Sequence, residues 1–97
     1  MRYNLRGKVW IYPGEAAWRF VNVSKQAARD IKENFGDSRR GFGSIPVTVK
    51  VGKTIWNTSI FPDSRSGTYL LPLKKEVRVE EGILAGKQLR YALPIRT

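Results

Sequence analysis

The sequence predicts a mainly β fold, a small barrel of two similar repeats with one clear helix and a second, short one. Three observations support this prediction. Apolar and polar residues alternate along several stretches, which is typical of strands that are buried on one face. One other stretch has its apolar residues at helical spacing, and the same order of elements occurs twice along the chain. The 97 residues suit one domain, residues 1–97, with a single modest core.

The first repeat is predicted to begin with a β-hairpin. A strand is expected over residues 3–12, and Gly7 inside it predicts a β-bulge, because glycine within a strand pattern often marks one. Pro13-Gly14-Glu15 is a turn sequence. The return strand is expected over residues 18–23.

A helix is predicted over residues 25–35. Ser24 stands where a helix N-cap is expected, and Gly36 stands at the expected stop. Val23 and Ala28 occupy the positions of a hydrophobic staple. The apolar residues of this segment form one helical stripe, namely Ala27, Ala28, Ile31 and Phe35.

The second half of the chain is predicted to be mostly extended. A loop over residues 36–44 comes first, and Gly52-Lys53 has the composition of a tight hairpin turn. Residues 74–81 favour a short helix that ends before Gly82. Strands are expected over residues 45–51, 54–61, 68–73 and 87–95.

An internal repeat links the two halves. Residues 20–27 match residues 70–77 at an offset of 50, and residues 7–14 are matched with Gly52-Lys53 followed by residues 60–63. Each repeat is then a strand, a turn, a strand and a helical segment, with a further strand after it. Two such units can close a barrel by exchanging strands, which removes the exposed sheet edges of a lone half.

Several motifs together resemble one known family. They are RGFGSIPV, WNTSIFPD, GTYLLPLKKEVR and the tail from Gly82 to Leu93, preceded by WRFVNV and its helix. This pattern covers nearly the whole chain and is similar to the bacterial and archaeal family called domain of unknown function 1905. The resemblance implies a double-split β-barrel, the fold of AbrB-type swapped-hairpin regulators, and it implies no settled activity.

The run LLPLKKEVR…GILAGKQLRYAL resembles the strand–Pro–helix–Gly–strand signature of the AbrB-type proteins. One position departs from it, because Lys87 stands where that signature usually has an acidic residue. AbrB-type proteins build their barrel from two chains, whereas this chain is expected to contain both halves.

The charge balance favours an anionic partner. Eighteen Lys and Arg residues against eight Asp and Glu give a formal net charge of +10. Such an excess in a small protein favours nucleic acid or another polyanion, and the alternative is a charged surface without such a partner. The chain has no His and no Cys, so disulfides and the commonest general base and metal ligands are absent. We expect no catalytic residue, no cofactor and no metal site.

Six basic residues are candidates for binding an anion or a nucleic acid. Glycines surround Arg39 and Arg40 in the loop, so that backbone N–H groups could converge on a phosphate; the alternative is a solvated connector. The basic residues of the second helical segment either contact a polyanion or form a solvated face. The six candidates are Arg39, Arg40, Lys53, Lys74, Lys75 and Arg78.

The three tryptophans, Trp10, Trp18 and Trp56, could stack on nucleic-acid bases. All three fall within predicted strands, however, which favours packing in the core or at its rim.

We therefore expect a nucleic-acid-binding or regulatory module. The alternative is a non-catalytic binding barrel for a small anionic ligand or an acidic protein partner, using the loop at residues 36–44. No signal peptide or membrane span is evident, which indicates a cytoplasmic protein. We expect a monomer or a small homo-oligomer.

Overall fold

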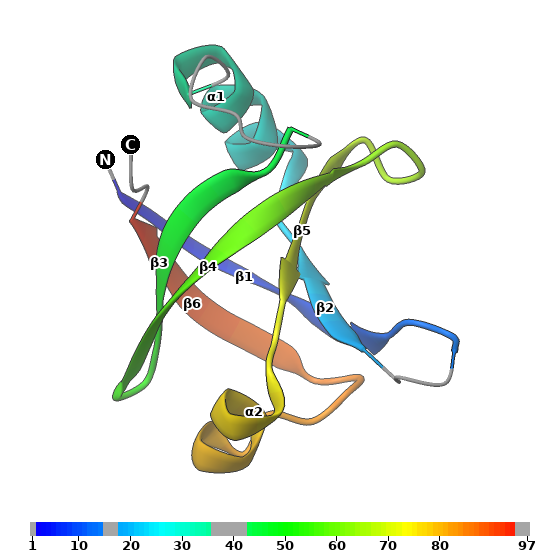
Figure 1. Ribbon diagram of the computed structural model, residues 1–97, viewed down its shortest axis with the longest axis vertical. Coiled ribbons are helices and arrows are strands. Elements are labelled where there is room, and N and C mark those ends of the chain that lie inside the picture. The colour runs from blue at the N-terminus through cyan, green and yellow to red at the C-terminus, as the bar shows by residue number, and fades with distance from the viewer. Residues whose placement is uncertain (1, 15–17, 36–42, 95–97) are drawn as a thin grey trace.

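Six antiparallel strands form a closed barrel in the order β1-β2-β5-β4-β3-β6. The computed structural model describes residues 2–14, 18–35 and 43–94. The two helices, α1 (Lys25–Phe35) and α2 (Lys75–Glu81), lie at opposite ends of the barrel (Figure 1). The strands are β1 (Arg2–Ile11), β2 (Arg19–Asn22), β3 (Ile45–Val51), β4 (Thr54–Asp63), β5 (Thr68–Pro72) and β6 (Gln88–Pro94). The predicted mainly β barrel with one longer and one shorter helix is confirmed.

Two long strands each pair first with one neighbour and then with another. In β1, residues 2–8 pair with β6 and residues 9–11 pair with β2. In β4, residues 54–60 pair with β3 and residues 61–63 pair with β5. This divided pairing closes the barrel without a free edge, and it is the double-split arrangement that the resemblance implied.

The pairing scheme has approximate two-fold symmetry. The series β1, β2, α1, β3 corresponds to β4, β5, α2, β6, and the β1–β6 and β1–β2 pairs have counterparts in β4–β3 and β4–β5. At the predicted offset of 50, Val21 corresponds to Leu71, and these two residues pair with each other. The registers also make Lys50 the equivalent of Ala92, its own pairing partner. A two-fold axis must pass between residues that pair with their own equivalents, so it runs through both pairs.

Two expectations about the first strand are wrong. Gly7 forms no bulge, because β1 pairs with β6 residue by residue on both sides of it. Gly7 is also not the equivalent of Gly52, which lies in the turn between β3 and β4 with a φ of +55°. The structure gives Gly7 another role: a Cβ atom there would lie 2.8 Å from Val21 Cγ2 and 3.2 Å from the carbonyl oxygen of Asn22. Glycine therefore allows β2 to approach β1 closely.

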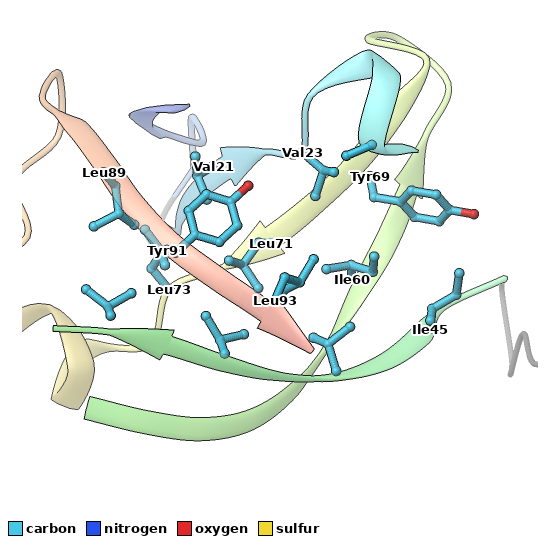
Figure 2. Packing of buried hydrophobic residues seen from close by; sticks show 14 of the residues in the cluster. Val21, Val23, Ile45, Ile60, Tyr69, Leu71, Leu73, Leu89, Tyr91 and Leu93 are labelled. Carbon is cyan, nitrogen blue, oxygen red and sulfur yellow. The ribbon is translucent and has the colours of Figure 1, made fainter. Parts of the chain in front are cut away.

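Residues at alternate strand positions fill the interior of the barrel, as the alternation predicted (Figure 2). Ile11, which the same alternation groups with Leu5 and Val9, is instead 46% exposed. Ile31 of α1 and Val77 of α2 join this core, and so does Trp56, as the packing interpretation favoured. The buried residues of β3 and β6 are Ile45, Val47, Val49, Val51, Leu89, Tyr91, Ala92 and Leu93.

The helix ends follow the predicted capping pattern where the structure describes them. The backbone N–H of Ala27 donates to Ser24 Oγ at 3.2 Å, which confirms the N-cap of α1. At the equivalent position of α2, Lys74 makes no side-chain cap. Gly82 ends α2 in the left-handed conformation, with a φ of +62°, as its predicted stop. The proposed stop at Gly36 lies outside the described residues.

Candidate functional site

The outer surface of β1, β6 and β3 carries basic side chains and no acidic ones. These three strands contain neither Asp nor Glu. Their basic residues alternate with the inward-pointing ones, so they all lie on the outside of the barrel and are exposed. We call this surface the basic face; it consists of Arg2, Arg6, Lys8, Lys50 and Arg90.

Two arginines of the basic face lie directly opposite each other. Arg6 of β1 pairs with Arg90 of β6 in the ladder. Like charges at directly opposed positions destabilise a sheet. Neither guanidinium has an ion-pair or hydrogen-bond partner among the residues that the structure describes. A bound anion would remove this repulsion, since a guanidinium donates hydrogen bonds readily to phosphate or carboxylate.

A pocket of about 500 Å³ opens beside this arginine pair. Lys50 of β3 lines it together with Arg6 and Arg90, so three basic residues share one hollow. It lies where β3 and β6 are joined by the Lys50–Ala92 pair. The remaining lining residues are Asn4, Leu5, Gly52, Tyr91 and Ala92.

Next to the basic face, four aromatic rings gather on the outside of the β1–β2 hairpin. We call Trp10, Tyr12, Trp18 and Phe20 the aromatic cluster. Ring centroids are 5.4 Å apart for Trp10 and Phe20 and 6.2 Å apart for Trp18 and Phe20, whose planes lie within 10° of parallel. Trp18 is 56% exposed and Tyr12 44%. The indole Nε1 of Trp10 donates to Asn22 Oδ1 at 2.6 Å, which holds that ring in place.

A second basic cavity, of about 750 Å³, lies between α1 and the turn that joins β4 to β5. Its helical wall carries three cations at i, i+4 and i+7, the spacing of one helix face: Lys25, Arg29 and Lys32. Its other wall carries the hydroxyls of Ser64, Ser66 and Thr68.

One carboxylate, Asp63, also lines this second cavity. It accepts hydrogen bonds from Ser66 Oγ at 2.7 Å and from the Ser66 backbone N–H at 3.2 Å. The hydrogen bond from the Ser66 side chain lowers the pKa of Asp63. The carboxylate is thus ionised at neutral pH, and it is hydrogen-bonded to Ser66 of the same turn.

The structure describes four of the six residues predicted as a site. Arg39 and Arg40 lie outside the described residues. Lys74 and Lys75 are exposed at the start of α2. Lys53 is exposed in the β3–β4 turn, beside Thr54, whose hydroxyl donates to Glu81 Oε2 at the other end of α2.

Arg78 has a structural partner. Its Nε donates to the carbonyl oxygen of Leu73 at 3.0 Å, which fastens the end of β5 to α2. The side chain of Arg78 is half-buried, and its other two guanidinium nitrogens can still donate hydrogen bonds to a ligand.

Sequence reasoning missed the basic face and understated the aromatic cluster. A signal was present, because Arg6 and Lys8 fall at alternate positions of a predicted strand on the face opposite to Leu5 and Val9. Arg90 occupies the same kind of position in the last strand. That β1 and β6 would be neighbours, with these arginines opposed, was not deducible from either strand alone.

Among the described residues, no three side chains of the types that ligate metals gather in one place. No helix in the described ranges has the length and apolar character needed to cross a membrane.

The fold and its surface define a class: small closed double-split β-barrels with a strongly basic outer face. The sequence matches the family model described as Domain of unknown function (DUF1905) over residues 6–93, and the chain belongs to that family. A search among curated proteins found no significant match.

Proposed function

We propose that this protein binds nucleic acid through its basic face and carries out no catalysis. The observation that supports this most is the opposed pair Arg6 and Arg90, with Lys50 beside it and no carboxylate on the three strands. A repulsive pair without counter-charges costs stability in the free protein. The phosphates of a nucleic acid carry the opposite charge, so binding would remove the repulsion between the two arginines, and this favours the complex.

The net charge of +10 supports the same proposal. Each Lys or Arg that neutralises a phosphate releases condensed counterions, which drives binding without regard to base sequence. The strands of the basic face contain no carboxylate that would compete with phosphate for the same donors, and the Glu81 carboxylate beside Gly52 of the pocket accepts a hydrogen bond from Thr54. The absence of His and Cys removes the usual catalytic groups, which supports a binding role.

Fluorescence anisotropy at several salt concentrations tests this proposal, with labelled duplex and single-stranded oligonucleotides. The variant Arg6→Gln/Arg90→Gln should make the negative slope of log K against log salt shallower by about 0.9 per lost duplex contact. The matched control Lys74→Gln/Lys75→Gln removes the same charge from the end of the barrel at α2 and should leave the slope nearer to that of the wild type. Equal slopes for both variants, or no binding by the wild type at low salt, would refute the basic face as the interface.

A second candidate function rests on the cavity at α1. Its three cations and the hydroxyl of Ser64 suit a small phosphorylated or carboxylated ligand, because ammonium, guanidinium and hydroxyl groups all donate hydrogen bonds to anionic oxygens. A ligand at about 100 times its Kd would stabilise the protein by about 2.7 kcal/mol. Thermal shift with phosphorylated metabolites would detect this, and the variant Arg29→Gln/Lys32→Gln should abolish it.

A further inference from the structure

We infer that the nucleic acid is single-stranded and that its bases stack on the aromatic cluster while its phosphates follow the basic face. This inference rests on the proposed function and adds to it the class of nucleic acid and the way it is held. It concerns one continuous surface, formed by the outward side of β1 and its neighbours β6 and β2.

The outward row of β1 passes directly from cations to aromatic rings. Arg6 and Lys8 precede Trp10 on the same face of the strand, and Tyr12 follows just beyond its end. Outward residues on a strand repeat every ~6.8 Å, so a chain lying along β1 meets positive charge first and rings next. The positive charge suits the phosphates of a nucleotide chain, and the rings suit its bases.

The rings lie where they are available to a ligand. Aromatic side chains usually supply core packing, yet Trp18 and Tyr12 are exposed on the outside of the barrel. The rings of Trp18 and Phe20 are stacked nearly parallel, and the exposed ring of Trp18 is the outer member of this stack on which a base can continue. Trp10 is oriented by its hydrogen bond to Asn22, so its ring is already fixed before a base arrives. Pre-oriented groups lose less freedom on binding, which favours affinity.

A pocket of about 410 Å³ lies at the junction of the two surfaces. Trp10 forms part of its wall, together with the basic residues Lys8 and Lys25. Its polar lining residues are hydrogen-bonded within the protein and form a fixed wall: Asn22 with Trp10 and Thr68, Ser24 with the Ala27 N–H, and Ser66 with Asp63. An aromatic residue and two lysines around one hollow suit the base and the phosphate of a single nucleotide.

The rings favour a single strand over a duplex. In a duplex the faces of the bases are covered by their neighbours, whereas a single strand can turn its bases onto aromatic side chains. The flanking cations also favour a nucleic acid over an apolar protein surface, because burying Lys8 against apolar groups would leave its charge unpaired.

The test compares three labelled ligands under identical salt conditions: an oligothymidine, an abasic oligodeoxynucleotide of the same length, and a duplex. An oligouridine serves as the RNA arm. We expect the base-containing single strands to bind about 5- to 150-fold more tightly than the abasic one for each base stacked. Tryptophan emission should change on binding.

Variants locate the stacking. Trp18→Ala should remove most of the advantage of oligothymidine over the abasic strand and leave abasic binding unchanged. Phe61→Ala is the control, because it also removes an exposed aromatic ring but on β4, which pairs with neither β1 nor β2. It should change neither affinity.

The possible failures are distinct. Equal affinities for the base-containing and abasic strands would refute stacking and leave phosphate binding by the basic face intact. A duplex that binds more tightly than either single strand would also refute the inference. If Trp18→Ala instead alters the oligomeric state and not the binding, the cluster is a protein–protein contact and the inference is overturned. If no ligand binds at low salt, the proposed function fails with it.

Discussion

Replacing Gly7 by alanine places a methyl group inside the barrel against Val21. The added Cβ would lie 2.8 Å from Val21 Cγ2, whereas carbon atoms in contact prefer about 3.5–4.0 Å. Val21 has no exposed surface and pairs with both Val9 of β1 and Leu71 of β5. It therefore has no space into which it can retreat, and the strands must separate.

The cost follows from two opposing effects. Overpacking a core by one methyl group usually costs about 1–3 kcal/mol. Alanine also has less conformational freedom than glycine in the unfolded chain, which raises the free energy of unfolding by about 0.4–1 kcal/mol. We expect a net loss of about 1–2 kcal/mol in the free energy of unfolding, which lowers the Tm by roughly 4–16 °C for a domain of this size.

A double-mutant cycle tests the mechanism by urea unfolding. Val21→Ala alone should cost about 2 kcal/mol, because it removes buried methyl groups. Combined with Gly7→Ala, it should cost at least 0.5 kcal/mol less than the sum of the two single changes, since the new methyl group fills the vacated space. Additive effects, or a Gly7→Ala protein as stable as the wild type, would show that the contact with Val21 is not why glycine stands there.

Three further changes test other parts of the fold. Ile31→Asp buries an unpaired carboxylate at a site without exposed surface and should cost several kcal/mol; an unchanged Tm would contradict the packing of α1. Ser24→Ala removes the acceptor for the Ala27 N–H and should cost about 1 kcal/mol in urea unfolding; no loss would mean that water replaces the cap. Burial and a hydrogen bond to Asp30 raise the pKa of Tyr3 to about 12. Its contribution to stability is therefore complete below pH 10 and is lost as the pH rises towards 12, and Tyr3→Phe should make that alkaline decline shallower; an identical pH profile would contradict the shift.

Local patterns predicted the elements well, because each depends on residues close in sequence. The stripe behind Ser24 defined α1 at both ends, and the alternation from Ile45 to Val51 defined β3 and its buried face. The offset of 50 between the repeats was correct for β2 and β5, where it pairs Val21 with Leu71.

The parts that failed depend on strand neighbours. Gly7 was assigned a bulge, because the sequence does not reveal that Val21 approaches it from the next strand. Arg6 and Arg90 lie opposite each other because the first and last strands of the chain pair. No pattern within a short stretch of sequence predicts this pairing. The candidate site was therefore predicted from charge clusters along the chain, while the structure assembles its basic face from three separated strands.

The two-fold axis through Val21–Leu71 and Lys50–Ala92 has a consequence for how the surface can be used. In a symmetric dimer of half-barrels, a residue on the axis would face its own copy, so a lysine at position 50 would oppose a second lysine. Joining both halves in one chain releases this constraint, and Lys50 faces Ala92 instead. Each half can then specialise: β1 carries Arg2, Arg6 and Lys8, whereas its symmetry equivalent β4 has no basic residue.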